Sequence, residues 1–464
     1  MARRTKVAEK RAPLEVPHEA YRTLRLPAIT VPATYPIETL VPEVRQQTPT
    51  VGQRATRPDG RLHGLGQTRY IDDLTFPGML YAKIKRAGIA SARIKSIDTR
   101  EAEAMPGVMA VLTGREIPVN SFGPSLKDQP VLADEQVFHA GDGVAAVAAV
   151  TEQIALEALD RIKVEYEPLQ AVFDPLDALK DGAHKVHAPN SNIYATKFIK
   201  KGDIDKGFAA SDHIFEGRFC TQMVEHVPLE PHATIAMWDP NGRVTIHSTL
   251  GRITLGRADV ARTLKLAINR IRIVATIVGG NFGGKNEITQ EPVLALLSKK
   301  TGRPVKGTFT RTEEFIATTT RHPIIMDYKT GVTKDGRIVA RKVRLVLDGG
   351  AYCSWSETTL GKACILAAGP YKIDNLLAEA FVVYTNKTMT GAMRGFGAPQ
   401  VCFAYESQMD DIATALNIDP LDIRLLNAFD EGSPSPTGQV LHSVVVKDSL
   451  LQAAQRFGWK EGRS

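Results

Sequence analysis

The sequence predicts an α+β protein of more than one domain, and three observations support this class. The chain has 464 residues, enough for two or three domains that each bury a core. Short apolar segments alternate with helical patterns over residues 60–170. A second series of strand patterns, from about residue 210, leads into a glycine-rich loop and further helices.

The first region is expected to alternate strands and helices. Apolar runs predict strands at 78–84, 108–112 and 143–150. A helix is predicted over 98–105, with Asp98 or Thr99 as its N-cap, because Pro106-Gly107 ends the pattern. Thr151 is predicted to cap a second helix that runs to about residue 161.

The second region is expected to be larger. Strands are predicted at 214–221, 233–238, 243–248, 270–278, 324–332 and 337–347. Helices are predicted at 287–300, 399–416 and 419–427. Gly302 ends the first of these helices, and Asp419-Pro420 begins the last. The polar stretch 171–205 between the two regions is expected to be a linker.

The N-terminal segment, residues 1–55, has a different composition. Seven prolines in its first 50 residues remove backbone donors and disfavour helix. We therefore expect a proline-rich arm, which either wraps a partner subunit or is partly disordered.

Composition limits the class of function. No apolar run approaches the roughly 18 residues that span a bilayer, so no membrane span is expected. The basic start is followed by no apolar stretch, which favours a cytoplasmic protein. The net charge of +7 comes from basic residues spread along the chain, either as a solvated surface or as a face for an anionic cofactor or acidic partner. No basic-aromatic module predicts nucleic-acid binding.

The four cysteines are Cys220, Cys353, Cys364 and Cys402. None belongs to a CxxC pair, so structural zinc or an iron–sulfur cluster is not expected on this chain. Buried reduced thiols are expected at all four positions.

The most informative stretch is Gly279-Gly280-Asn281-Phe282-Gly283-Gly284-Lys285-Asn286. Glycine permits positive φ and a close approach of backbone N–H groups, so this loop is expected to hold a phosphate or another oxyanion. The spacing fits the phosphate loop of nucleotide hydrolases up to Lys285, but Asn286 stands where that motif needs a magnesium-binding Ser or Thr. The GxGxxG dinucleotide fingerprint is not matched. Taken alone, the run could also be a purely structural tight turn.

Other motifs give this loop its context. In the second region they are Glu225-His226-Val227-Pro228-Leu229-Glu230-Pro231-His232, Thr301-Gly302-Arg303-Pro304-Val305-Lys306, Arg321-His322-Pro323 and Ala392-Met393-Arg394-Gly395-Phe396-Gly397-Ala398-Pro399-Gln400. In the first region they are Arg69-Tyr70-Ile71-Asp72-Asp73, Pro106-Gly107-Val108 and Val131-Leu132-Ala133-Asp134. Together they resemble the molybdopterin-binding subunits of the xanthine dehydrogenase and aldehyde oxidase family. The resemblance implies an α/β-hammerhead domain over 56–170 and a first molybdopterin-binding domain over 206–464.

The resemblance also implies a molybdenum hydroxylase that oxidises an electron-poor carbon of an aromatic N-heterocycle, either nicotinate-like or purine-like, with water as the oxygen source. The cofactor would be molybdenum–molybdopterin in its cytosine dinucleotide form, with no side chain ligating the metal directly. Electrons would leave through [2Fe–2S] clusters to FAD, which an iron–sulfur subunit and a flavin subunit would carry.

Site residues are carried over position by position. The catalytic positions would be Phe282 and Arg394, and the cofactor-binding positions would be Gly280, Phe282, Gly283, Arg394 and Gly395. The substrate would lie against Asn286, Lys362 and Phe396. For Lys362 the alternative is a solvated surface lysine, and for Phe396 it is a core aromatic.

Two positions depart from the purine-oxidising members of the family. Asn286 replaces the substrate-binding glutamate, with Glu287 next to it, and Lys362 replaces the substrate-orienting arginine. Lysine is a point charge without a bidentate fork, and Asn offers a donor and an acceptor without charge. This pair favours a carboxylated, nicotinate-like N-heterocycle over xanthine.

The family's catalytic glutamate lies in a second molybdopterin-binding domain, and residue 464 is near where that domain would start. We therefore expect this glutamate on a partner chain, a second molybdopterin-binding subunit. Within the family, an aldehyde oxidoreductase or an aromatic acyl-CoA reductase is the alternative. Outside it, the alternatives are a phosphate-loop nucleotide hydrolase and a non-catalytic scaffold.

Overall fold

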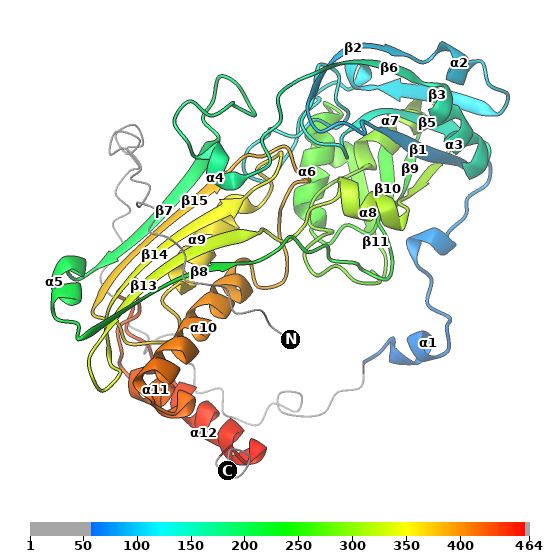
Figure 1. Ribbon diagram of the computed structural model, residues 1–464. Helices are drawn as coiled ribbons and strands as arrows, with labels where there is room; N and C mark the ends of the chain where they lie inside the picture. The colour runs from blue at the N-terminus through cyan, green and yellow to red at the C-terminus, as the bar shows by residue number, and fades with distance from the viewer. Residues whose placement is uncertain (1–56, 460–464) are drawn as a thin grey trace, which may run out of the picture. The chain divides into compact units, whose positions relative to one another are not determined.

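The computed structural model describes residues 57–459, so the arm predicted for residues 1–55 lies outside the described residues. The chain divides into two compact units, residues 1–67 and residues 68–464. The described part of the first unit contains helix α1 (Gly60–Gly64). All the other elements belong to the second unit (Figure 1).

A five-stranded sheet in the order β7-β15-β14-β13-β8 forms one part of the second unit (Figure 1). Its strands are β7 (Ile193–Lys201), β8 (His213–Cys220), β13 (Ile324–Val332), β14 (Ile338–Asp348) and β15 (Asn375–Val383). Only β14 and β15 run parallel among these neighbours. Helices α9 (Ser356–Leu366) and α10 (Ala398–Leu416) bury apolar side chains against this sheet.

A seven-stranded sheet in the order β11-β10-β9-β12-β1-β5-β3 forms the other part. Its strands are β1 (Leu80–Arg86), β3 (Val108–Thr113), β5 (Gly143–Ala149), β9 (Ala233–Trp238), β10 (Val244–Ser248), β11 (Ile271–Ala275) and β12 (Val305–Thr308). Strand β1 of the first region pairs in parallel with β12 of the second, with Leu80 opposite Val305. One sheet is therefore built from both regions.

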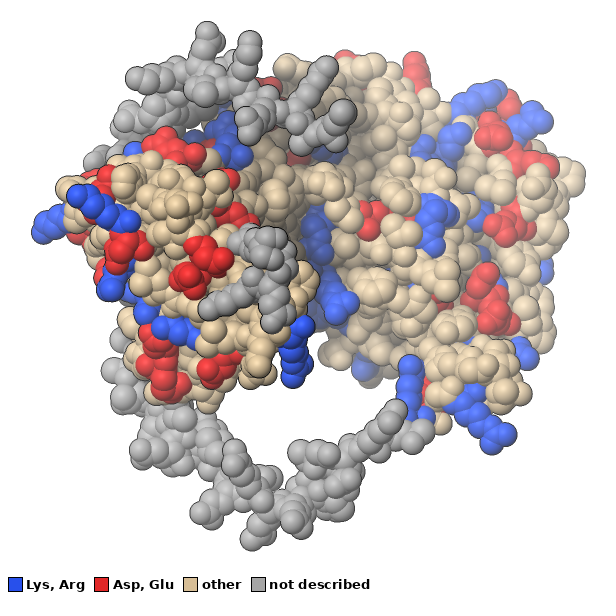
Figure 2. Space-filling view, turned by 60° about the horizontal axis from the view of Figure 1, so that its bottom comes forward, with Lys and Arg blue, Asp and Glu red and all other residues tan. Residues whose placement is uncertain are grey.

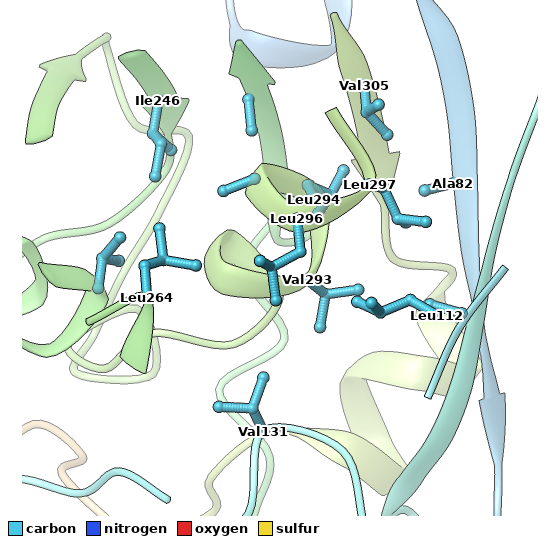
Figure 3. Close-up of a cluster of buried hydrophobic side chains, with 14 of the residues drawn as sticks. Ala82, Leu112, Val131, Ile246, Leu264, Val293, Leu294, Leu296, Leu297 and Val305 are labelled. Atoms are coloured by element: carbon cyan, nitrogen blue, oxygen red, sulfur yellow. The ribbon is translucent and has the colours of Figure 1, made fainter. Parts of the chain in front are cut away.

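Helix α7 (Glu291–Thr301) fills the core on one face of this sheet. Figure 3 shows Val293, Leu294, Leu296 and Leu297 between side chains of the first region, such as Leu112, and those of the second. Successive side chains of a strand point to opposite faces. Ala146 and Ala148 of β5 accordingly pack on the α7 side, whereas Ala145 and Val147 pack with α3 (Glu152–Arg161) on the other side.

The remaining elements complete the described chain. A three-stranded sheet has the order β4-β2-β6, formed by β4 (Gln136–Val137), β2 (Ala92–Asp98) and β6 (Lys163–Pro168). The other helices are α2 (Arg100–Glu103), α4 (Pro175–Ala178), α5 (Ile204–Ala209), α6 (Ile253–Thr263), α8 (Arg311–Ala317), α11 (Pro420–Asn427) and α12 (Val446–Phe457). Three-residue 3-10 turns cover 71–73, 114–116 and 268–270. Within residues 57–459, no helix combines the length and apolar character needed to cross a bilayer.

Most predicted elements are confirmed, and three expectations need correction. The helix predicted over 98–105 is only α2, because β2 extends to Asp98. The stretch 171–205 is more than a linker, since α4 lies in it and β7 forms an edge of the five-stranded sheet. The helix predicted from residue 287 begins at Glu291, so the glycine run does not open it directly.

The cysteine prediction holds for two of the four positions. All four thiols are free, and Cys353 and Cys364 are buried, but Cys220 and Cys402 are exposed. Cys220 ends β8, an edge strand of the five-stranded sheet whose side chains alternate between exposed and half-buried.

Candidate functional site

Two loops meet at the candidate site. We call residues 279–286 the glycine loop and residues 392–397 the arginine loop. The backbone N–H of Arg394 donates to the carbonyl oxygen of Phe282, at 2.8 Å. A Cβ added to Gly283 would lie 2.4 Å from the carbonyl oxygen of Ala392, so only glycine permits this approach. The structure thus joins Phe282 to Arg394 and packs Gly283 against Ala392, whereas Gly280 and Gly395 are near this junction only as neighbours along the two loops.

Each loop carries one phenylalanine in a left-handed backbone conformation. The φ angle is 49° at Phe282 and 50° at Phe396. Non-glycine residues adopt such angles only where surrounding contacts impose them, and these residues cluster at functional sites. Phe282 is 47% exposed, and Phe396 is half-buried.

His226 ties the two loops together. Its Nε2 donates to the carbonyl oxygen of Ala392 at 2.8 Å, and its ring lies against Gly284, where a Cβ would come within 2.9 Å of Nδ1. Nδ1 itself makes no hydrogen bond among residues 57–459, and the carboxylate nearest to it is that of Glu225, at 3.7 Å. Both side chains are buried.

Glu230 and Lys285 form a buried ion pair beneath the glycine loop. The Lys285 ammonium donates to the carbonyl oxygen of Glu230 at 2.7 Å and to its carboxylate at 3.0 Å. The same carboxylate accepts from the backbone N–H of Gly279 at 2.7 Å. Burial lowers the pKa of Lys285, and the charge of Glu230 opposes that shift. Lys285 is fully buried and bound to Glu230, so it is not available to a nucleotide phosphate.

His232 supports the end of the same loop. Its Nδ1 lies 2.9 Å from the buried Glu314 carboxylate, and its Nε2 lies 3.3 Å from the carbonyl oxygen of Gly284. Four residues of the 225–232 motif therefore act as a scaffold beneath or between the loops: Glu225, His226, Glu230 and His232. The sequence indicated this motif only through the family resemblance.

Arg321 holds the arginine loop from the other side. Its guanidinium donates to the carbonyl oxygen of Arg394 at 3.0 Å. Next to it, His322 lies within 2.7 Å of the Ser356 hydroxyl at the start of α9. Burial lowers the pKa of His322 to about 3, so this histidine is neutral near pH 7.

The hydrogen-bond donors of the two loops that have no partner in the described chain fit an anionic ligand. Among residues 57–459, no acceptor is found for the backbone N–H groups of Gly280, Asn281 and Phe282. The Arg394 side chain is exposed and has no ion-pair partner within the same residues. Free backbone N–H donors on one loop and an exposed guanidinium on the adjoining loop are the chemistry that an anionic cofactor requires. No group of three or more His, Cys, Asp or Glu in the described chain could ligate a metal directly.

The three predicted substrate-binding residues lie on different elements. Half-buried Asn286 ends the glycine loop, and Phe396 lies in the arginine loop. Lys362 is exposed on α9. That helix contacts the arginine loop, since a Cβ at Gly397 would meet Ala363 at 2.7 Å. No hydrogen bond joins Lys362 to Asn286 in the described structure.

Glu287 stands out in the sequence only as the neighbour of Asn286, and the structure gives it a distinct environment. Its Oε1 accepts from the Ser354 hydroxyl, and its Oε2 is buried without a partner among the described residues. Burial raises the pKa of Glu287 to about 7, with Asp128 and Asp259 adding to the shift and Ser354 opposing it. No local motif marks this residue, because Ser354 is 67 positions away.

Positive and negative side chains are interspersed over the face in Figure 2, and basic side chains lie along the hollow that crosses it. Mixed charges of this kind are typical of a solvated surface rather than a nucleic-acid interface.

Two family models match the chain. One, described as the molybdopterin cofactor-binding domain, matches residues 184–428. The other, described as the a/b hammerhead domain of aldehyde oxidase and xanthine dehydrogenase, matches residues 65–170.

Similar proteins fall into two length classes. The nicotinate dehydrogenase large molybdopterin subunit of Eubacterium barkeri is 38% identical, over 87% of this chain and 95% of that protein. The xanthine dehydrogenase molybdenum-binding subunit of Escherichia coli is 33% identical, over 88% of this chain and 56% of that protein. The structure of the aldehyde oxidoreductase from Desulfovibrio gigas matches with a TM-score of 0.84 and 31% identity, over 87% of this chain and 46% of that one. The chain thus spans about half the length of the latter two.

Proposed function

The chain belongs to the aldehyde oxidase and xanthine dehydrogenase family of molybdopterin-binding proteins, and from this we propose that it is the molybdopterin-binding subunit of a multi-subunit molybdenum hydroxylase. The expected family and fold class are confirmed by the two matched models. The proposed reaction is oxidation of an electron-poor carbon in an aromatic N-heterocycle. The observation that supports the proposal most directly is the hydrogen bond from the Arg394 N–H to the Phe282 carbonyl oxygen, which joins the glycine loop to the arginine loop. Within residues 57–459, the adjacent backbone N–H groups of the glycine loop stay free.

We propose that these loops hold the cofactor through their backbone. A bound molybdopterin supplies two-electron redox chemistry with water as the oxygen source. Gly280 and Gly283 allow the glycine loop to approach it, and the free N–H of Phe282 faces it. Arg394 and Gly395 contact it from the arginine loop. The catalytic roles proposed for Phe282 and Arg394 are to position the cofactor through these backbone groups and the exposed guanidinium.

The substrate is proposed to lie against Asn286, Lys362 and Phe396. Phe396 supplies an aromatic face for a flat ring. Lys362 carries an exposed positive charge on a helix that touches the arginine loop, and Asn286 adds a neutral donor and acceptor. A ring that carries a carboxylate satisfies this pair better than a neutral purine.

The partners proposed are a second molybdopterin-binding subunit that bears the catalytic glutamate, an iron–sulfur subunit with [2Fe–2S] clusters and a flavin subunit with FAD. The match to 95% of a protein described as a large molybdopterin subunit supports this division. Exposed apolar side chains near the site also support a covering partner, since Val227 is 49% and Leu229 is 92% exposed. We also propose that the molybdopterin cofactor is in its cytosine dinucleotide form.

The test is purification of the complex that forms around the full chain. We expect molybdenum and a pterin dinucleotide in that complex, and reduction of an electron acceptor with a pyridine carboxylate as substrate. Faster turnover of an aldehyde would favour aldehyde oxidoreductase, to which the structure is also similar. A complex without molybdenum would contradict the proposal.

A further inference from the structure

Arg252 and Trp355 form a pair beside the glycine loop. The guanidinium carbon of Arg252 lies 4.5 Å from the centroid of the Trp355 ring, the geometry of a cation–π contact. Arg252 is exposed, and within residues 57–459 its guanidinium has no carboxylate partner and no hydrogen bond. The cation is thus held in place on an aromatic face while its donors stay free.

Backbone contacts place this pair next to Asn286. The N–H of Gly251 donates to the carbonyl oxygen of Lys285 at 2.6 Å, on one side of Asn286. The Ser354 hydroxyl donates to Glu287, on the other side. Arg252 follows Gly251 in the chain, and Trp355 follows Ser354. Because consecutive Cα atoms are about 3.8 Å apart, both residues lie close to the two contacts that flank Asn286.

The wall around this pair carries polar atoms without partners. Trp355 Nε1, Thr359 Oγ1 and Glu287 Oε2 are buried and make no hydrogen bond within the described structure. Buried polar atoms in native proteins are satisfied by protein, water or ligand. Trp355 Nε1 belongs to the ring that Arg252 covers, Thr359 lies one helical turn after Trp355, and Glu287 is joined to Ser354, the residue before Trp355. Unpartnered polar atoms on these neighbouring residues support a place where a polar molecule binds.

We propose that Arg252, held against Trp355, is a specificity-determining residue that binds the carboxylate of the substrate, an inference that rests on the proposed function. The planar guanidinium binds a carboxylate through two parallel hydrogen bonds, which lysine cannot do. Trp355 directly precedes α9, and Lys362 lies seven positions further along, about 10 Å away at the rise of a helix. Arg252 thus adds a bidentate partner for the substrate carboxylate to the point charge proposed above for Lys362.

The test compares pyridine-3-carboxylate with pyridine-3-carboxamide in the purified complex. Arg252→Gln should raise KM for the carboxylate roughly 10- to 100-fold, because a charge-assisted hydrogen-bonded pair is lost. KM for the carboxamide should rise less, by no more than about fivefold, since no charge pair is lost and the glutamine amide can still donate to the carboxamide oxygen. Arg257→Gln is the matched control, because Arg257 is on the helix that follows Arg252 and its guanidinium is bound to the carbonyl oxygen of Ile268. It should leave both KM values unchanged.

A binding measurement separates this inference from the proposed reaction. Pyridine-3-carboxylate should change the tryptophan fluorescence of the complex, and either Trp355→Phe or Arg252→Gln should abolish the change. If the change is seen without turnover, the proposed reaction fails and the carboxylate site stands. If Arg252→Gln raises both KM values equally, or leaves the fluorescence response intact, the role of Arg252 is refuted.

Discussion

At the scale of single residues, Phe282 and Phe396 show how the candidate site holds strained backbone. A left-handed conformation costs a non-glycine residue on the order of 1–3 kcal/mol. The Phe282 carbonyl is fixed by the N–H of Arg394, and the Phe396 N–H donates to the carbonyl oxygen of Met393. One contact between the loops and one within the arginine loop therefore offset this local cost and fix the backbone at both phenylalanines.

Gly283→Ala tests this arrangement. Gly283 has φ 113°, and its new Cβ would meet backbone atoms of Ala392 rather than a flexible side chain. We expect the free energy of unfolding to fall by roughly 2 kcal/mol or more and the molybdenum content of the purified complex to fall with it. Gly361→Ala is the control, since nothing lies within 4 Å of its added Cβ. Alanine is about 1 kcal/mol more favourable than glycine within a helix, so this variant should not be destabilised. Equal molybdenum content in both variants would refute the requirement for glycine at position 283.

At the scale of elements, the site depends on a scaffold that the sequence indicates only in part. The glycine loop and the arginine loop stand out in the sequence by their composition. Their contact with His226 does not, because it joins positions 166 residues apart. Helix α9, which carries Lys362, was not predicted, since Gly361 interrupts a segment without clear periodicity. Strand β15 was missed because a Leu- and Ala-rich run also suits a helix.

The ion pair beneath the glycine loop gives a prediction at this scale. Lys285→Met keeps the volume but leaves the Glu230 carboxylate buried without its cation, which should cost about 3–5 kcal/mol of unfolding free energy. Adding Glu230→Gln should recover at least half of that loss, because the amide oxygen can still accept from Gly279. The measurement is denaturant unfolding of both variants. A phosphate-binding lysine would behave differently, with lost MgATP binding and little change in stability.

At the scale of the whole molecule, the two regions that the sequence predicts share one core. The strand pattern at 78–84 predicted β1, but the short strand β12 was not predicted. Its pairing with β1 was not predicted either, since residues about 225 positions apart leave no local signal for their pairing. Edge strand β7 falls within the predicted linker because it contains exposed lysines and otherwise mostly half-buried residues. The apolar face of α7 is covered by Leu80, Ala82 and Leu112 from the first region. We therefore expect that neither region buries α7 completely without the other.

Fragments test this dependence. A fragment of residues 171–464 exposes the β12 edge and the leucines of α7, so we expect it to aggregate or to lack cooperative unfolding. A fragment of residues 57–170 keeps β1, β3 and β5 but loses the same cover on one face. Co-expressed, the two should associate into one species with a single unfolding transition, because the register of β1 on β12 and the packing on α7 are both restored. The measurement is size-exclusion chromatography with thermal unfolding followed by circular dichroism. A fragment of residues 171–464 that is monomeric and unfolds cooperatively would show that the second region forms a core of its own, and it would assign α7 to that core alone.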